Sequence, residues 1–209
     1  MKKDIIKLRY GNTNTFFLPG KGGGLLVDTD YAGMLPQFFH AIKTAGVEVR
    51  DISYVIATHF HPDHIGLVGE LQKLCVTLVI LEEQLGSVHF ADRIFARDRR
   101  IHYTPIDETS ARVITCAESR SFLHDLGIEG EILHTPSHSE DSVSVLLDDG
   151  VCMVGDLEPM EFLEGYADNP QLQRDWEQIM THRPNRILFA HANEKTFKKQ
   201  LADASKAES

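Results

Sequence analysis

Cysteine is scarce in this sequence: the 209 residues include three, Cys75, Cys116 and Cys152. An odd count without a CxxC pair argues against a disulfide framework and against a thiolate metal site. Long apolar runs are missing too, because no stretch approaches the roughly 20 apolar residues that a membrane helix needs. The first twelve residues, MKKDIIKLRYGN, lack the features of a signal peptide. We therefore expect a cytoplasmic protein that makes no use of a membrane.

Positive charge is also in short supply, with 21 Lys and Arg against 31 Asp and Glu and a formal net charge of -10. Nucleic-acid binding requires a basic surface, so no nucleic-acid partner is expected. The composition, 42% hydrophobic and 25% charged, is ordinary for a globular protein. The length suits one domain with its own apolar core, and we expect residues 1–209 to form it.

Short apolar runs separated by turn residues predict strands. They cover residues 5–10, 15–18, 24–28, 52–58, 77–81, 130–135, 143–147, 151–156 and 186–191. Apolar residues at helical spacing predict helices over residues 34–46, 67–74, 119–127 and 171–183, and a fraying C-terminal helix over 193–209. Residues 82–120 are less regular and predict one or two helices and a long loop, with a strand possible near 112–115. The alternation indicates a layered α/β domain.

The stretch ATHFHPDHIG, residues 57–66, places His59, His61, Asp63 and His64 within six positions. Random placement of the histidines and aspartates of this chain would produce this pattern roughly two times in a thousand. Neutral imidazoles and carboxylates are ligands for borderline divalent metals. Alternate side chains of a tight loop can point in different directions, so His59 and His61 could serve one ion while Asp63 and His64 serve another.

Three further segments deliver residues of the same chemistry after apolar runs. His138 follows a predicted strand in ILHTPSHS, Asp156 follows VCMVG, and His191 ends RILFAH. Any one of them alone would be read as a solvated loop residue. Together with the cluster at 57–66, they form the pattern of a preorganised metal site built from strand ends.

These motifs, in this order, resemble those of the metallo-β-lactamase superfamily, in its glyoxalase II-like branch, over nearly the whole chain. LLVDTD resembles the early motif, THFHPDH the signature motif, VGD the bridging-Asp motif and FAH the terminal His motif. TPSHS resembles the TPGH motif, with Ser137 in place of the usual Gly. The resemblance implies a four-layer αβ/βα sandwich with two mixed β-sheets and the metals at one edge of both.

The resemblance also implies a role for each residue of the motifs. A first ion would be held by His59, His61 and His138, and a second by Asp63, His64 and His191, with Asp156 bridging the two. Asp28 would support the metal loop from behind. All seven ligand positions are filled, so two divalent ions are expected. Zinc is the first choice, with iron or manganese as alternatives, because the set contains imidazoles and carboxylates without thiolate.

Such a site lowers the pKa of a bound water and stabilises negative charge on a substrate, which implies metal-assisted hydrolysis. Asp63 would orient the resulting hydroxide and handle its proton. Antibiotic-destroying members of the superfamily generally lack the residue matching Asp156, and some lack the one matching His64. The length leaves no room for a flavodoxin domain, a nucleic-acid-processing insertion or the helical substrate domain of glyoxalase II. The implied substrate is a small ester, thioester or lactone.

Two other functions stay open. One is a mononuclear iron oxidoreductase similar to the thiol or persulfide dioxygenases of this superfamily, which do not need Asp63, His64 and His191. The other is a metal-binding domain without catalysis. The complete ligand set argues against both, and the sequence does not determine the oligomeric state.

Residues 82–120 are the expected substrate-facing insertion. Its candidate contacts for an anionic small molecule are Arg93, Arg97, Arg99, Arg100, His102 and Tyr103. Tyr166 and Asn193 are weaker candidates of the same kind. The favoured interpretation of these basic residues is nevertheless a solvated helix face, because runs of charge usually lie on the surface.

Overall fold

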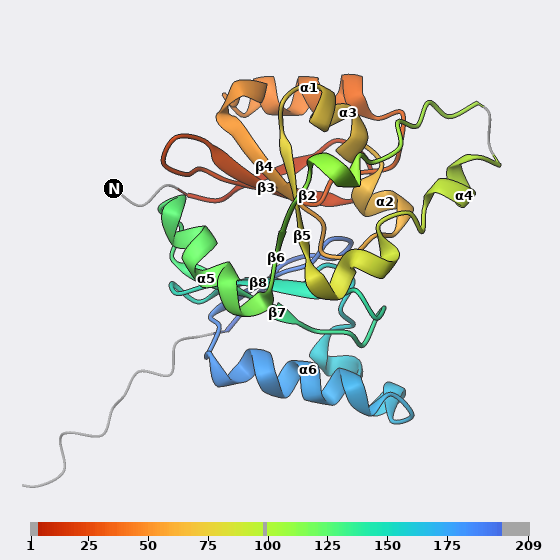
Figure 1. Ribbon diagram of the computed structural model, residues 1–209. Helices are drawn as coiled ribbons and strands as arrows, with labels where there is room; N and C mark the ends of the chain where they lie inside the picture. The colour runs from red at the N-terminus through yellow and green to blue at the C-terminus, as the bar shows by residue number, and fades with distance from the viewer. Residues whose placement is uncertain (1–3, 98–99, 198–209) are drawn as a thin grey trace, which may run out of the picture.

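The computed structural model describes residues 4–97 and 100–197. Two β-sheets pack face to face between outer helices (Figure 1). The first sheet has the order β1-β2-β3-β4-β5-β6. Its strands are Ile6–Arg9, Asn14–Leu18, Gly24–Val27, Ile52–Ile56, Thr77–Leu81 and Arg112–Ile114. The second sheet has the order β11-β10-β9-β8-β7. Its strands are Lys195–Thr196, Arg186–Leu188, Val151–Met153, Val143–Leu147 and Gly130–His134.

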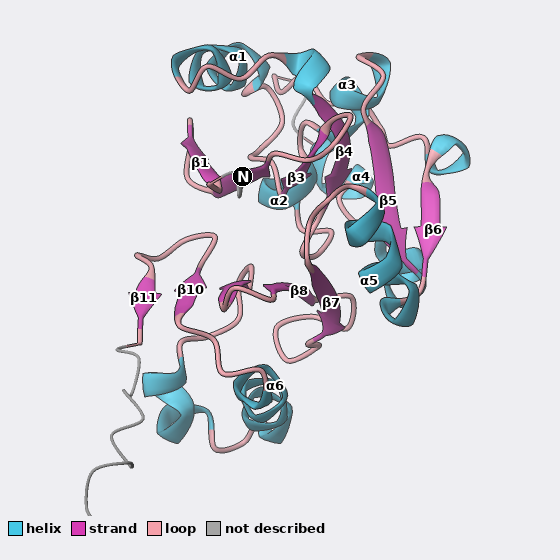
Figure 2. Cartoon of the chain, turned by 90° about the vertical axis from the view of Figure 1, so that its left-hand side faces the viewer, coloured by secondary structure: helices cyan, strands magenta, loops and turns pink. Residues whose placement is uncertain are grey.

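Both sheets are mixed, as expected. In the first, β1, β2 and β3 run antiparallel to one another, and β3 through β6 run parallel. In the second, β9 and β10 form the parallel pair, and the other neighbours are antiparallel. Helices α1 (Leu35–Thr44) and α3 (Val68–Lys73) cover the outer face of the first sheet, and α6 (Pro170–Thr181) covers the second (Figure 2). This arrangement confirms the predicted four-layer sandwich.

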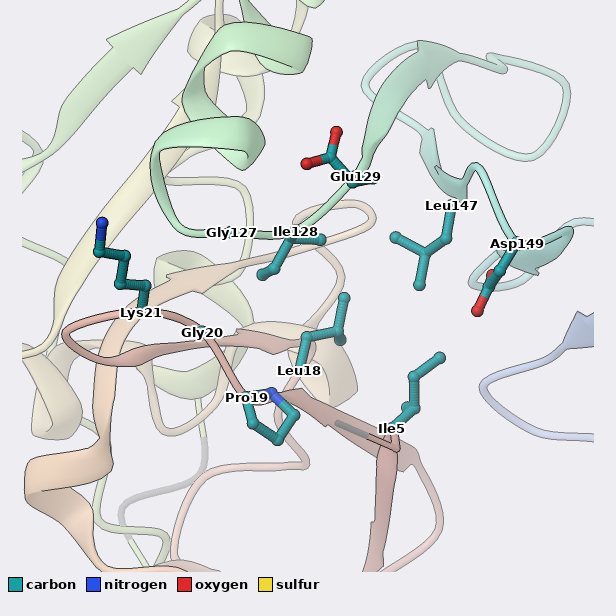
Figure 3. A pocket seen from close by; sticks show the side chains of 10 residues that line it. All are labelled: Ile5, Leu18, Pro19, Gly20, Lys21, Gly127, Ile128, Glu129, Leu147 and Asp149. Atoms are coloured by element: carbon teal, nitrogen blue, oxygen red, sulfur yellow. The ribbon is translucent and has the colours of Figure 1, made fainter. Parts of the chain in front are cut away.

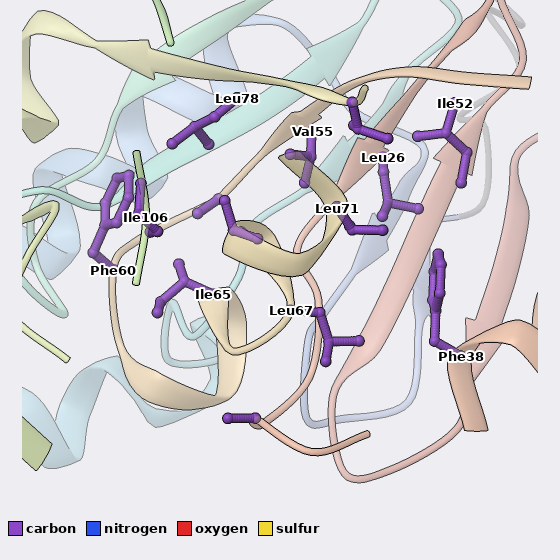
Figure 4. Close-up of a cluster of buried hydrophobic side chains, with 14 of the residues drawn as sticks. Leu26, Phe38, Ile52, Val55, Phe60, Ile65, Leu67, Leu71, Leu78 and Ile106 are labelled. Carbon is purple, nitrogen blue, oxygen red and sulfur yellow. The ribbon is translucent and has the colours of Figure 1, made fainter. Parts of the chain in front are cut away.

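The central strands are buried on both faces, and alternate side chains enter different layers. On β3, Leu26 packs under the outer helices with Phe38 of α1 and Leu71 of α3 (Figure 4). Its neighbours Leu25 and Val27 point the other way, into the core between the sheets. All five are fully buried. These apolar runs place the ends of the central strands firmly, and the functional candidates follow those ends.

The second sheet repeats the pattern against α6. Leu146 of β8 packs outward with Trp176 and Ile179 of α6. Val145 and Leu147 point into the core between the sheets. Helix α5 (Cys116–Asp125) packs on β7 and closes one side of that core (Figure 2).

The predicted helix over 193–209 is wrong for the part that the structure describes. Lys195 and Thr196 form β11, an antiparallel edge strand paired with Arg186 and Ile187 of β10. The open edge of β10 has unpaired backbone N–H and C=O groups, and a two-residue strand can form hydrogen bonds with them. The helix propensity of these residues does not outweigh this pairing. Residues 198–209 lie outside the described residues.

The segment 82–120 contains several short elements. Two 3-10 turns, Glu82–Ser87 and Glu108–Ser110, flank helix α4 (Asp92–Phe95). The segment ends in β6, which pairs in parallel with β5, and in the start of α5. That helix begins three residues before the predicted 119–127 because Thr115 and Glu118 form a capping box. Of the helices in the described part of the chain, none has the length and apolar character needed to cross a membrane.

Candidate metal centre

The candidate ligands meet at one edge of the sandwich because parallel neighbours end there. Strands β3 and β4 lie side by side in the first sheet, and β9 and β10 do so in the second. The chain leaves β4 at Ile56 and enters the one-turn helix α2 (Pro62–Ile65). His61 precedes that helix in extended backbone, and Pro62 occupies its first position, where the missing N–H is not needed.

Seven side chains, from these segments and from the loop between β7 and β8 that carries His138, come together in three overlapping groups. Within each group the ligand atoms lie within 4.8 Å of one another. The groups are His59, His61 and His138; His59, His64 and Asp156; and Asp63, His64 and His191. All seven predicted ligands are therefore in one place, although their role in holding ions stays a prediction.

Two ends of the cluster can be distinguished by atom. At one end, Nε2 of His138 lies 3.2 Å from Nδ1 of His61. At the other, Nε2 of His191 lies 3.2 Å from Nε2 of His64 and 3.1 Å from Oδ2 of Asp63. Nitrogen atoms that converge at such distances leave room for a cation that all of them can coordinate.

Asp156 lies between the two ends, and each of its oxygens faces one of them. Oδ2 is 3.8 Å from Nε2 of His59 and 3.7 Å from Nε2 of His138. Oδ1 is 3.3 Å from Nε2 of His64 and 3.3 Å from Nε2 of His191. This is the geometry of a carboxylate that can bridge two cations.

Two buried atoms of the cluster support the fit of a cation. Nε2 of His59 and Oδ1 of Asp156 are both inaccessible, and neither forms a hydrogen bond of good geometry, although Oδ1 lies 3.3 Å from Nε2 of His64 and from Nε2 of His191. Buried polar atoms are nearly always satisfied, so such orphans indicate a partner from outside the protein chain. Both atoms point into the cluster, where a divalent ion would satisfy them.

The lowered pKa values of two of the imidazoles also suit a cation, because a neutral imidazole can coordinate it. Burial, followed by the neighbouring His64, lowers the pKa of His59 well below its usual value. Burial and His138 lower the pKa of His61. Burial opposes a charge on His64, but Asp28 and Asp156 outweigh it and raise its pKa to about 10. A metal ion that binds Nε2 of His64 would displace the proton on that nitrogen.

Asp28 contacts the loop that carries the candidate ligands, and its role in supporting a metal site stays a prediction. Its Oδ1 accepts the backbone N–H of Thr58 at 2.6 Å, and its Oδ2 accepts the Thr58 hydroxyl at 2.9 Å. Oδ2 also lies 3.1 Å from Nδ1 of His64. Asp28 is 1% exposed and has a left-handed φ of 61°, a conformation that is rare for a residue other than glycine. Such strain persists only where surrounding contacts hold it in place.

Other supporting residues were missed by the sequence reasoning. Asp141 is 5% exposed and accepts the backbone N–H of Phe60 at 2.7 Å. Gln84, fully buried, donates to the carbonyl oxygens of Ala57 and Asp141 at 2.9 and 3.1 Å. These contacts fix the backbone on both sides of His59. In the sequence, the only sign of Asp141 and Gln84 was that each is a polar residue close to an apolar segment.

The predicted substrate contacts stay predictions. Arg93, Arg97 and Arg100 are exposed, Asn193 is exposed two residues after His191, and Tyr166 is 38% exposed. Arg99 lies outside the described residues. The Tyr103 hydroxyl donates to Asp92 at 2.7 Å and its ring stacks on Phe95, with centroids 4.2 Å apart.

The segment does supply one contact that the sequence did not single out. The ring of Phe90 lies 5.3 Å from the ring of His61, centroid to centroid, and Phe90 is 52% exposed. An apolar surface therefore adjoins the His61 end of the cluster.

A separate cavity of about 730 Å³ lies at the opposite edge of the sandwich. Its floor is formed by apolar side chains from both sheets, including Leu18 at the end of β2 and Leu147 at the end of β8 (Figure 3). Lys21, Glu129 and Asp149 stand at its margin, and its lining contains no histidine. The titratable groups of the metal edge are absent from this cavity.

Comparison with known proteins agrees with this geometry. The sequence profile of the Metallo-beta-lactamase superfamily matches residues 8–191. The chain belongs to this superfamily. Its members are mostly metal-dependent hydrolases. In this superfamily member, the matched region runs from β1 to the last candidate ligand, His191.

Two curated proteins are similar to it. The Beta-lactamase-like protein 2 homolog of Drosophila melanogaster is 26% identical over 181 residues, which cover 87% of this chain and 59% of that protein. A putative diflavin flavoprotein of Synechocystis is 26% identical over 92 residues, 44% of this chain and 15% of that protein. This chain thus spans about three fifths of the length of the fly protein and a smaller share of the Synechocystis protein.

Solved structures share the fold. A metallo-beta-lactamase family protein from Thermus thermophilus has a TM-score of 0.72 at 19% identity, over 92% of this chain and 74% of that one. A putative metallo-beta-lactamase from Thermotoga maritima has a TM-score of 0.65 at 18% identity, over 91% of both chains. These likenesses establish the metallo-β-lactamase fold and carry no information on the substrate.

Proposed function

We propose that this superfamily member is a dinuclear metal-dependent hydrolase that acts on a small ester, thioester or lactone. The observation that carries the proposal is Asp156, whose two oxygens face two separate groups of imidazoles. A carboxylate with a histidine group on each side serves two cations better than one.

The seven candidate ligands suit two ions, with zinc as the first choice. One ion would be held by His59, His61 and His138, and the other by Asp63, His64 and His191. Asp156 would bind both ions. When bound, the ions would supply an acidified water and a stabilising charge for the oxygen of the substrate.

The protein residues prepare the site before substrate arrives. The lowered pKa values of His59 and His61 leave both imidazoles neutral near pH 7, so their lone pairs are free. The hydrogen bond with His191 lowers the pKa of Asp63 to about 2. Asp63 is therefore ionised, and with its side chain 39% exposed it can accept a hydrogen bond from an attacking water and orient it.

The ligand set and surroundings also favour a small carbonyl substrate over a β-lactam or a nucleic acid. Antibiotic-destroying members generally lack the residue that Asp156 matches, and some lack the one that His64 matches. The formal net charge of -10 disfavours a polyanion. Phe90 offers an apolar surface beside His61, which suits the acyl or alkyl part of an ester.

The proposal is tested by elemental analysis of the purified chain, followed by assays with thioesters, lactones, β-lactams and phosphodiesters. We expect about two ions per chain and hydrolysis that a chelator abolishes and added metal restores. Asp156→Ala should empty both ends of the cluster and lower kcat/KM by about a hundredfold or more. His124→Ala, a matched loss of an exposed histidine paired with Glu129, should keep both ions.

Two results would contradict the proposal. If the gently purified protein contained no bound metal, the proposed metal site would have no support. A single iron per chain together with oxygen consumption would favour the oxidative alternative.

A further inference from the structure

The loop that carries His138 is held by helix α6 of the outer layer. Asp175 on α6 accepts the backbone N–H of Ser137 at 2.8 Å through Oδ2. Asn169, the N-cap of the same helix, donates from Nδ2 to the Ser137 carbonyl oxygen at 3.1 Å. Both backbone polar groups of Ser137, the residue before His138, are therefore bound by one helix.

Asp175 is an unusual residue for its position. It is 0% exposed and lies on the apolar face of α6 with Leu172, Trp176 and Ile179. No cation is paired with it within residues 4–97 and 100–197. A buried carboxylate without a cationic partner is costly, and an apolar side chain there would pack more favourably.

The orientation of Asp175 is fixed by its own helix. Gln171 donates from Nε2 to Oδ1 of Asp175 at 2.7 Å. Arg174 donates to Oε1 of Gln171 at 2.7 and 3.1 Å, which leaves the Gln171 amide nitrogen facing Asp175. Oδ2 is thereby directed at the Ser137 N–H.

His138 depends on its backbone more than most other candidate ligands. Three other candidate ligands have a partner on Nδ1, the nitrogen that faces away from the cluster. Nδ1 of His64 lies 3.1 Å from Asp28, and Nδ1 of His59 lies 3.3 Å from the Thr58 hydroxyl. Nδ1 of His191 lies 3.3 Å from the Asn12 carbonyl oxygen. His138 has no such partner on Nδ1 among the described residues, and its side chain is 29% exposed. Its placement therefore comes from the loop.

We propose that Asp175 is a positioning residue for His138, so that helix α6 forms part of the support of the first ion. The inference rests on the proposed function, because it requires His138 to hold an ion. Asp175 acts through the Ser137 backbone and does not touch the ion or the substrate.

The test is a titration of the metal-free, full-length chain with Co²⁺, followed by visible absorption and by competition with a chromophoric chelator. We expect Asp175→Ala to weaken one of the two sites by at least about tenfold and to change its absorption spectrum. The other site should stay within about twofold of the wild type. Asp175→Asn keeps an acceptor for Ser137 but loses the bond from Gln171, so its effect should be intermediate.

Ile179→Ala is the matched control, because Ile179 is fully buried on the same face of α6 and belongs to the same apolar cluster. It should lower the melting temperature and leave both dissociation constants unchanged. A double-mutant cycle then assigns the site: Asp175→Ala should have no further effect on Co²⁺ binding in a His138→Ala background.

Failure of this inference and failure of the proposed function give different results. A wild-type chain that binds no Co²⁺ would overturn the proposed function and the inference with it. If the wild type binds two ions, equal effects of Asp175→Ala and Ile179→Ala on affinity would overturn the inference alone. Equal weakening of both sites by Asp175→Ala would do the same. Should Asp175→Ala not fold, Asp175→Asn and Asn169→Ala carry the comparison, and wild-type affinities in both would overturn the inference.

Discussion

The imidazole of His64 and the carboxylate of Asp28 lie 3.1 Å apart, fully buried, at the back of the candidate metal centre. Asp28 follows β3 and His64 lies in α2, so the contact joins the end of one strand to the loop that follows its parallel neighbour. It fixes which nitrogen of His64 faces the cluster, because Nδ1 is engaged and Nε2 is left to face Asp156. The stability of the loop and its ligand geometry are therefore coupled.

Asp28→Ala should destabilise the metal-free chain by about 3 kcal/mol, because His64 and the Thr58 N–H would lose a buried partner. Urea unfolding in the absence of metal measures this change. Asp125→Ala removes an exposed aspartate at the end of α5 and should change stability by less than about 0.5 kcal/mol. Similar losses in the two variants would contradict the role of Asp28.

Gly155→Ala should destabilise the chain by about 3 kcal/mol and weaken metal binding. Gly155 has a left-handed φ of 57°, and an added Cβ would lie 2.4 Å from the Thr58 hydroxyl oxygen, which Asp28 holds. At Gly86 an added Cβ meets no heavy atom within 4 Å, so Gly86→Ala should be close to neutral. Thermal unfolding and Co²⁺ titration of both variants measure the difference, and a neutral Gly155→Ala would be the contrary result.

Phe90→Ala should change substrate preference without a large loss of stability, because the ring is 52% exposed yet lies 5.3 Å from the ring of His61. For an ester with a large apolar acyl group we expect KM to rise about tenfold relative to the acetyl ester. Val113→Ala, which trims an exposed side chain on the edge strand β6, should leave this ratio unchanged. An unchanged ratio in Phe90→Ala would exclude Phe90 from the substrate surface.

The metal-free chain should lose stability as the pH falls from about 4 toward 2. The pKa of Asp63 is lowered from 3.8 to about 2 in the folded state, chiefly by its hydrogen bond with His191. A lowered folded pKa stabilises the folded state above the unfolded pKa, and protonation removes that contribution as the pH falls through the folded value. Urea unfolding at a series of pH values measures the slope.

Asp63→Asn should reduce this slope without abolishing it, because the amide does not titrate but Asp156, whose pKa is also lowered to about 2, still does. The exposed Asp125→Asn serves as the control and should keep the wild-type slope. A wild-type slope in Asp63→Asn would show that other groups account for the acid sensitivity.

Local patterns predicted most of the fold. Apolar runs such as 77–81 became strands because they can be buried on both faces of a sheet between helical layers. The early start of α5 was also present in the sequence, as Thr115 and Glu118 of a capping box. The C-terminal strand β11 could not be predicted, because two residues carry no strand periodicity and the strand exists only through its pairing with β10.

The residues of the candidate site also fall into those that the sequence predicts and those that it does not. Its seven ligand-type residues could be named from the sequence, because imidazole and carboxylate chemistry belongs to the residue type and each residue follows an apolar run. The roles of Asp141, Gln84 and Asp175 could not, because a buried polar side chain looks like a surface one until its partner is known. Asp175 offered one hint, as an acid on the apolar face of an otherwise regular helix.

The sequence by itself determined the class of side chain available, the order of the motifs and the layered fold, since all three depend on residue chemistry and short-range periodicity. Only the tertiary structure decided that Asp156 directs one oxygen to each group of imidazoles and that Asp28 engages His64. It also decided that α6 holds the loop of His138. These relationships join residues up to about 100 positions apart, and their distances follow from how the strands and layers pack, which spacing along the chain does not encode.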